Sequence, residues 1–287
     1  MDANILIDQF RIRTAPNYIA QGDEEAVFRA AFAAHLPVLL KGPTGCGKTR
    51  FVEHMAFVLG VPLITVSCHE DLTAADLVGR FLFKDDQTVW QDGPLTLAVR
   101  AGGICYLDEI VEARKDTTVV IHSLTDDRRM LAIDKTGEVV RAHPDFMVVL
   151  SYNPGYQSIV KDLKHSTRQR FVSLEFDHPA VAVDARIIAS ETGLDEANSR
   201  RLAEMGARIR ELQGFGLEEG VSTRLLVYAG RLIQAGLAPL DACRAAISCT
   251  LTDEPDIAEA IDNIARLHFG DLLDDRGHGA SSAPITH

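Results

Sequence analysis

A glycine-rich segment near residue 45 has the residue types and spacing that bind a phosphate. Residues 42–49 read Gly-Pro-Thr-Gly-Cys-Gly-Lys-Thr, which fits the pattern G-x-x-x-x-G-K-[ST]. Glycines let backbone N–H groups surround a phosphate, and the start of the following helix adds positive potential. Lys48 stands where a helix dipole disfavours a cation, so a bound anion explains its position better than a fortuitous loop does. We predict a nucleotide site formed by Gly42, Pro43, Thr44, Gly45, Cys46, Gly47, Lys48 and Thr49.

Two adjacent carboxylates, Asp108 and Glu109, end the apolar run 104–107. At the end of a strand, Asp108 can join Thr49 in holding Mg²⁺, and Glu109 can polarise a water for attack on the γ-phosphate of ATP. Kinases with a phosphate-binding loop do not need this second carboxylate, so Glu109 favours hydrolysis. The alternative is an acidic pair that caps a helix.

Asn153 follows another apolar run, in the segment Ser-Tyr-Asn-Pro of residues 151–154. Its amide can orient the attacking water at the same edge of a sheet. Taken alone, Asn-Pro indicates only a turn.

Five short apolar runs predict the strands that position these residues. None alternates cleanly between apolar and polar residues, which is typical of strands buried on both faces of a parallel sheet. Helical stretches lie between them, and one of these, 50–59, is closed by Gly60. The repeated alternation predicts a doubly wound α/β domain. The runs are 38–40, 63–66, 104–107, 146–150 and 171–174.

Two segments break this alternation with hairpin patterns. A helix with a capping box at Thr73 is followed by apolar residues on both sides of the turn 84–87, and another helix begins at Pro94. The second hairpin surrounds the turn 134–137, just ahead of the fourth buried strand. One interpretation is a helix interrupted by a hairpin and a second hairpin before the strand; the other is two ordinary surface excursions.

After about residue 177 the strand patterns stop. Apolar residues then recur at helical spacing, for example Leu225, Leu226, Ala229, Leu232 and Ile233. We predict an α/β nucleotide-binding domain over 1–177, an all-helical domain over 178–270 and a disordered tail over 271–287, which is rich in Gly, Ser, Asp and His.

The composition excludes several classes of protein. Of 287 residues, 46% are hydrophobic and 24% charged, as in globular proteins, and 29 basic against 41 acidic residues give a net charge of −12. This acidity argues against general binding to DNA, RNA or anionic membrane. No apolar run approaches the roughly 18 residues that span a bilayer, and the first residues lack an export pattern. Five cysteines with no C-x-x-C pair predict reduced thiols in the cytoplasm.

Two cysteine-containing segments imitate functional sites. Residues 68–71, Cys-His-Glu-Asp, resemble a metal cluster, but four adjacent residues cannot all converge on one ion in regular structure. Cys46 in the phosphate loop is either an oxidation switch, favoured by the helix start, or a small filler; the filler is the simpler interpretation.

Taken together, these patterns resemble the MoxR branch of the AAA+ ATPases, whose members carry one hairpin inside the second helix and another before the fourth strand. Further segments are similar to the CbbQ/NorQ/NirQ proteins, densely over 16–176 and more loosely over 177–268. The resemblance implies an AAA+ P-loop fold, a parallel sheet between helices with both hairpins, and a small helical lid domain. The segments are 41–49, 68–73, 89–95, 125–129, 151–157 and 166–171.

The same resemblance implies roles that spacing alone does not give. AAA+ proteins form rings, usually hexamers, with ATP between subunits, and an arginine before the fifth strand reaches the neighbour's γ-phosphate. Arg170 matches that position, with Arg168 as its competitor; without the resemblance both would be surface arginines. Arg224, in a helix that Ser222 caps, resembles the sensor-2 arginine. The resemblance also implies an adenine pocket near Ile19.

The resemblance implies a ring-forming, Mg²⁺-dependent ATPase that remodels a protein client with a von Willebrand factor A domain partner, CbbO-like or NorD-like. CbbQ proteins release inhibitory sugar phosphates from Rubisco, whereas NorQ and NirQ proteins mature or activate nitric oxide reductase. We expect Rubisco as the client, with nitric oxide reductase as the alternative. Other candidates are a DNA-directed AAA+ machine, an assembly module that binds ATP without hydrolysing it, and a P-loop kinase.

Overall fold

The computed structural model describes residues 7–154, 163–214, 216–217 and 219–270. The chain divides into two compact units. The first contains residues 1–43 and 47–177, and the second contains residues 44–46 and 178–287. The predicted tail over 271–287 lies outside the described residues. Among those described, no helix has both the length and the apolar character that a bilayer span requires.

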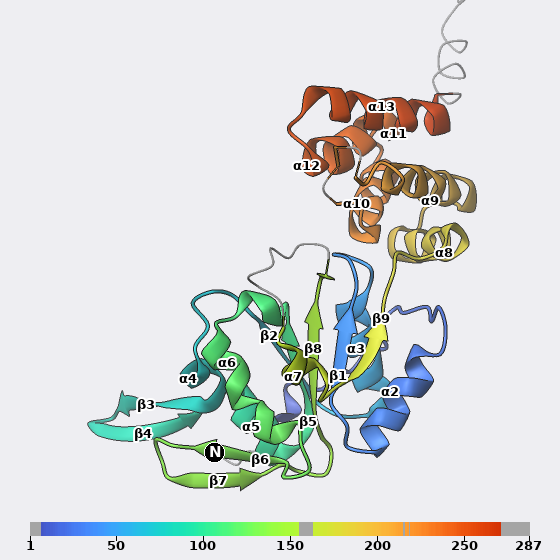
Figure 1. The fold of residues 1–287 in the computed structure, drawn as a ribbon. Helices are drawn as coiled ribbons and strands as arrows, with labels where there is room; N and C mark the ends of the chain where they lie inside the picture. The colour runs from blue at the N-terminus through green and yellow to red at the C-terminus, as the bar shows by residue number, and fades with distance from the viewer. Residues whose placement is uncertain (1–6, 155–162, 215, 218, 271–287) are drawn as a thin grey trace, which may run out of the picture. The chain divides into compact units, whose positions relative to one another are not determined.

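A parallel five-stranded sheet forms the centre of the first unit (Figure 1). The strand order is β2-β5-β8-β1-β9, so every neighbouring pair is joined by a crossover, as the strand–helix alternation predicted. All five apolar runs became strands of this sheet, which confirms the predicted α/β class. The strands are β1 (Val38–Lys41), β2 (Leu63–Ser67), β5 (Gly103–Asp108), β8 (Phe146–Tyr152) and β9 (Val172–Glu175).

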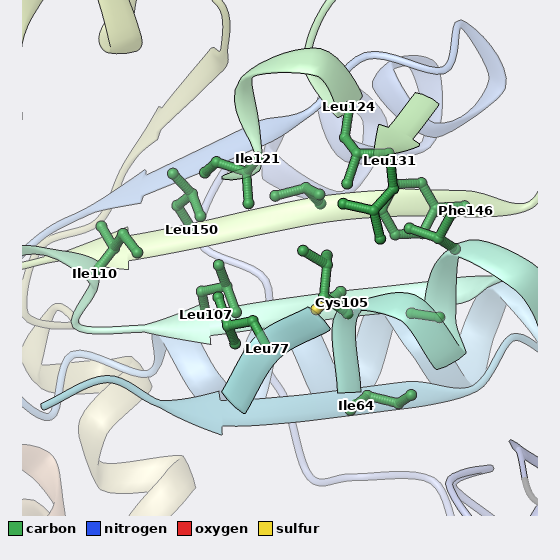
Figure 2. Packing of buried hydrophobic residues seen from close by; sticks show 14 of the residues in the cluster. Ile64, Leu77, Cys105, Leu107, Ile110, Ile121, Leu124, Leu131, Phe146 and Leu150 are labelled. Carbon is green, nitrogen blue, oxygen red and sulfur yellow. The ribbon is translucent and has the colours of Figure 1, made fainter. Parts of the chain in front are cut away.

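Alternation along the strands sends side chains to two separate layers. On one face, Cys105 and Leu107 of β5 pack with Leu150 of β8 and with residues of the covering helices, including Leu77 and Ile121. Figure 2 shows these side chains converging between the sheet and the elements that cover it. Helices α4 (Ala74–Val78), α5 (Pro94–Ala101) and α6 (Lys115–Val120) belong to this layer. The opposite face of β5 carries Tyr106 and therefore meets a different set of neighbours.

The second layer contains α2 (Glu24–Ala33) and α3 (Lys48–Leu59). Phe28 and Phe51 are fully buried there and meet edge to face, with ring centroids 5.4 Å apart. Helix α3 ends at Gly60 in the left-handed conformation, the C-terminal stop that the sequence predicted.

The prediction that every strand is buried on both faces is wrong for the two edge strands. In β9 only Leu174 is buried, and in β2 the side chain of Thr65 is exposed. The reason is position, because an edge strand has a neighbour on one side only and its helical cover is incomplete.

Both predicted hairpins are present. Strands β3 (Gly79–Lys84) and β4 (Gln87–Asp92) pair between α4 and α5, and β6 (Met130–Ile133) pairs with β7 (Glu138–Arg141) before β8. Arg100 of α5 joins the two hairpins, since its guanidinium donates to Asp92 at 3.0 Å and to both oxygens of Glu138 at 2.6 and 2.5 Å. Both hairpins extend from the same side of the unit (Figure 1).

The second unit is helical. The five apolar residues whose spacing predicted a helix all lie in α10. Leu232 is 36% exposed because it lies on the outer face of that helix. A buried carboxylate, Asp184, ties the unit together: it accepts hydrogen bonds from Arg210 and Thr223, each 2.7 Å long. The main helices are α8 (Val181–Thr192), α9 (Glu196–Arg210), α10 (Thr223–Gln234), α11 (Pro239–Cys243) and α13 (Pro255–Phe269).

Candidate functional site

The predicted phosphate loop connects β1 to α3 at the carboxyl end of the sheet. Gly47 directly precedes the helix with φ of 103°, a backbone conformation that glycine adopts without strain. Gly42 needs its missing side chain for another reason: a Cβ there would lie 2.4 Å from the carbonyl oxygen of Phe176. The loop can therefore keep this path only with glycine at both positions.

Lys48 is the cation of this loop. Its ammonium donates to the carbonyl oxygens of Gly42 at 2.7 Å and Pro43 at 2.8 Å, and the residue is only 9% exposed. The backbone of the loop therefore surrounds the Lys48 ammonium, and its positive charge is held at the start of α3. This is the chemistry that attracts a phosphate. Residues Thr44, Gly45 and Cys46 group with the second unit.

Three hydroxyl groups surround the carboxylate of Asp108. Tyr106 donates to Oδ1 at 2.6 Å, Ser151 donates to the same oxygen, and Thr49 donates to Oδ2 at 3.3 Å. Strand alternation accounts for the cluster, because Tyr106 and Asp108 are two residues apart on β5 and point to the face that α3 covers. Ser151 follows in register on β8, where Leu150 pairs with Leu107.

The oxygen atoms of Thr49 and Asp108 fit a bound Mg²⁺. Hard divalent cations take oxygen ligands, and Mg²⁺ in nucleotide sites uses one or two protein groups together with phosphates and waters. Two protein oxygens 3.3 Å apart beside a phosphate loop match this requirement. Within the described part of the chain, no group of three or more His, Cys, Asp and Glu side chains gathers as a metal site.

Glu109 has an unusual backbone, with φ of 55° and ψ of 49°. This left-handed conformation is uncommon outside glycine and costs of order 1–3 kcal/mol. The Glu109 N–H donates to Ser151 at 3.1 Å, so the hydroxyl that orients Asp108 also fixes the turn after it. The side chain of Glu109 is exposed, where a water can reach it.

The negative charges of Asp108 and Glu109 help to raise the pKa values of nearby groups. The pKa of the Cys68 thiol is raised to about 12, first by burial and then by the negative charges of Asp108 and Glu109. Burial, followed by the charge of Asp108, likewise raises the pKa of Tyr106. Both groups therefore stay protonated at neutral pH, and Tyr106 remains a hydrogen-bond donor.

Asn153 lies one residue beyond the end of β8 and is half-buried. Because β5 and β8 are parallel and in register, their carboxyl ends place Asn153 at the sheet edge that carries Asp108 and Glu109. The predicted adenine segment lies near α3, since the ring of Tyr18 packs 5.3 Å from Phe51, and Ile19 beside it is half-buried.

The two candidate arginines lie elsewhere. Arg168 ends the short helix α7 (His165–Arg168), and Arg170 stands two residues before β9. Since Val172 pairs with Val38, Arg170 lies at the amino end of the parallel sheet, opposite the phosphate loop. Arg224 belongs to the second unit, in the first turn of α10, and the predicted cap by Ser222 is present through a hydrogen bond to the Leu225 N–H.

Sequence reasoning missed Tyr106 and Ser151 as organisers of the site. The available signal was a hydroxyl group inside an otherwise apolar buried strand, because such a group needs a partner. It also missed Asp126 and His122, which contact Arg170.

Comparison with known proteins agrees with this geometry. The AAA domain (dynein-related subfamily) family matches residues 37–171, and the CbbQ/NirQ/NorQ C-terminal family matches residues 184–268. Protein CbbQ of Hydrogenophilus thermoluteolus is 60% identical over 264 residues, covering 92% of this chain and 99% of that protein. The chain belongs to the CbbQ/NirQ/NorQ family of AAA+ ATPases.

Other members of the CbbQ/NirQ/NorQ family are about as similar. Protein NorQ of Paracoccus denitrificans is 60% identical over 256 residues, covering 89% of this chain and 95% of that protein. Denitrification regulatory protein NirQ of Stutzerimonas stutzeri is 54% identical over 256 residues, covering 89% of this chain and 93% of that protein. As a member of this family the chain is a MoxR-like, nucleotide-binding ATP hydrolase, which confirms the predicted activity.

A solved structure supports the fold alone. The RuvB Holliday junction branch migration motor of Thermotoga maritima aligns with a TM-score of 0.54 at 16% identity, over 89% of this chain and 72% of that one.

Replacing Ser151 by alanine tests the hydrogen-bond cluster. The substitution removes one donor to Asp108 and the acceptor of the Glu109 N–H, so we expect the ATPase rate to fall about 10- to 100-fold, as when groups that orient metal ligands are lost. A buried group without its partner should also lower the free energy of unfolding by about 1–3 kcal/mol. Steady-state ATPase assays and denaturant titration measure both effects.

Ser173→Ala, on the exposed part of β9, is the matched control and should change neither quantity. Equal behaviour of the two variants would show that Ser151 does not organise the site.

Proposed function

We propose that the chain assembles into a ring, hexameric as in related AAA+ proteins, and hydrolyses ATP with Mg²⁺ between neighbouring subunits. The observation that carries this proposal is the position of Arg170. The phosphate loop follows the carboxyl end of β1, whereas Arg170 precedes the amino end of β9, which pairs with β1. β1 has four residues, about 13 Å at roughly 3.3 Å per residue. This separation supports the proposal that Arg170 serves a neighbour's phosphate rather than its own.

Each residue of the carboxyl-end cluster has a role in this proposal. Lys48 and the loop N–H groups bind the phosphates, and Thr49 with Asp108 would hold Mg²⁺, which neutralises charge on the phosphates. Glu109 accepts the proton of the attacking water, and Asn153 orients that water. Glu109 favours turnover over an assembly module that only binds ATP.

The remaining predicted residues complete the site. Arg224, in the first turn of α10, is proposed to contact phosphate. Ile19 is proposed to contact the adenine from the segment that packs on α3. Arg170 supplies positive charge to the transition state, a contribution of about 10³–10⁵ in rate in related NTPases.

The work of hydrolysis is directed to a protein client, with a von Willebrand factor A domain partner. The net charge of −12 favours proteins over nucleic acid as the client. Rubisco, freed from inhibitory sugar phosphates, is the first candidate, supported by the 99% coverage of protein CbbQ. Nitric oxide reductase is the second candidate. It is supported by the similarity to NorQ, which is as high as the similarity to CbbQ, and by the name of NirQ as a denitrification regulatory protein. Five free cysteines favour the cytoplasm.

A mixing experiment tests catalysis across subunits. Glu109→Gln and Arg170→Ala should each bind ATP but hydrolyse it slowly. Mixed rings contain interfaces where an intact Glu109 faces a neighbour's intact Arg170, so we expect the ATPase rate of the mixture to exceed the line between the two variants at fixed total protein. Arg168→Ala, the control, should do less harm. A linear dependence on the mixing ratio contradicts the proposal.

A reconstitution tests the client. The chain, its von Willebrand factor A domain partner and ATP should restore carboxylation by Rubisco that a tightly bound sugar phosphate has inhibited, whereas Glu109→Gln should not. No recovery of Rubisco, together with ATP-dependent activation of nitric oxide reductase under the same conditions, replaces the first candidate by the second.

A further inference from the structure

Arg170 is held within its own subunit by two acceptors. Its Nη1 atom donates to the carbonyl oxygen of His122 at 3.2 Å and to Oδ2 of Asp126 at 3.3 Å. The arginine is half-buried, with 35% of its side chain exposed. An arginine that is free to move would lose much side-chain entropy on meeting a phosphate, and these contacts reduce that loss.

The carboxylate of Asp126 is itself fixed by Arg128. The Arg128 N–H donates to Oδ1 at 3.1 Å, and the guanidinium donates to Oδ1 from Nε at 3.0 Å and to Oδ2 from Nη2 at 2.7 Å. These contacts hold the pKa of Asp126 at about 2, with the hydrogen bond from the Arg128 side chain as the largest cause. Asp126 is therefore a negatively charged, oriented acceptor at neutral pH.

A second connection fixes the turn that carries Arg170. Thr167 is buried, and its hydroxyl lies 3.2 Å from Nε2 of His122. The Arg170 N–H donates to the carbonyl oxygen of Thr167 at 3.1 Å. His122 therefore contacts this turn through its ring and the Arg170 guanidinium through its carbonyl group. The backbone and the side chain of Arg170 are both positioned by the same segment.

Both contacts of the guanidinium use Nη1. Among the described residues, none accepts a hydrogen bond from Nη2 of Arg170. Because a guanidinium is planar and rigid, fixing one terminal nitrogen also sets the direction of the other. The protein contacts therefore orient the group without using the nitrogen that a phosphate oxygen could meet.

We propose that Asp126 is a positioning residue for Arg170: its carboxylate orients the guanidinium toward the phosphate bound by the neighbouring subunit. This inference rests on the proposed function, in which Arg170 acts across the subunit interface. Asp126 touches neither substrate nor Mg²⁺; it acts only through Arg170. Its neighbour Asp127 is exposed, and among the described residues no hydrogen bond or ion pair joins Asp127 to Arg170.

The test replaces Asp126 by asparagine, which keeps the shape but removes the charge. We expect kcat to fall about 10- to 100-fold, because misplacing a catalytic group by about 1 Å has an effect of that size. The KM for ATP and ring assembly should be unchanged, since the phosphate loop is intact. Asp126→Glu restores the carboxylate and should recover part of the rate. Asp127→Asn is the matched control and should leave kcat unchanged.

Mixed rings provide the readout that a merely structural role would not give. Asp126→Asn mixed with Glu109→Gln should exceed the linear expectation, because the first variant retains Glu109 and the second retains a positioned Arg170. A mixture of Asp126→Asn with Arg170→Ala should not exceed the linear expectation, since neither variant supplies a correctly positioned Arg170. The double variant Asp126→Asn/Arg170→Ala should be no slower than Arg170→Ala.

The outcomes separate this inference from the proposed function. If Arg170→Ala is inactive while Asp126→Asn keeps full activity, Asp126 does not position Arg170 and the proposed function stands. If Arg170→Ala itself keeps full activity, both fail. A rate loss in Asp126→Asn that Glu109→Gln cannot complement also overturns the positioning role.

Discussion

The hydrogen bonds to Asp108 are the interaction on which the rest of the site depends. Tyr106 from the same strand, Ser151 from the next strand and Thr49 from the loop helix all donate to one carboxylate. A buried tyrosine hydroxyl and a buried serine hydroxyl each need a partner, and the half-buried carboxylate needs donors. One cluster satisfies all of these groups and fixes the relative positions of β5, β8 and α3. The phosphate loop and the turn at Glu109 are then positioned by the same contacts.

The parallel sheet separates two kinds of charge. Its carboxyl end gathers the loop lysine and the carboxylates Asp108 and Glu109, as expected for ligand sites in open α/β sheets. Its amino end holds Arg170 against Asp126. A single strand length keeps the arginine away from its own phosphate loop. In the proposed ring a second subunit would bring the two ends together, which is why the proposed activity needs a ring.

Much of this architecture could be predicted from local sequence patterns. The phosphate loop, the helix stop at Gly60 and the two hairpins each depend on residues a few positions apart, so composition and spacing are sufficient. The partners Asp108 with Ser151 and Arg170 with Asp126 could not be predicted, because they are more than 40 positions apart and meet only through the strand order. The exposed edge of β9 also depends on that order.

In the proposed ring, an active site is complete only where two subunits meet. The specific ATPase activity per subunit, measured against protein concentration with mass photometry in parallel, tests it most directly. We expect a low rate where single subunits dominate and a steep rise that follows the fraction of chains in rings, with ATP binding already present at low concentration. A full rate per subunit in dilute samples that contain only single subunits would contradict it.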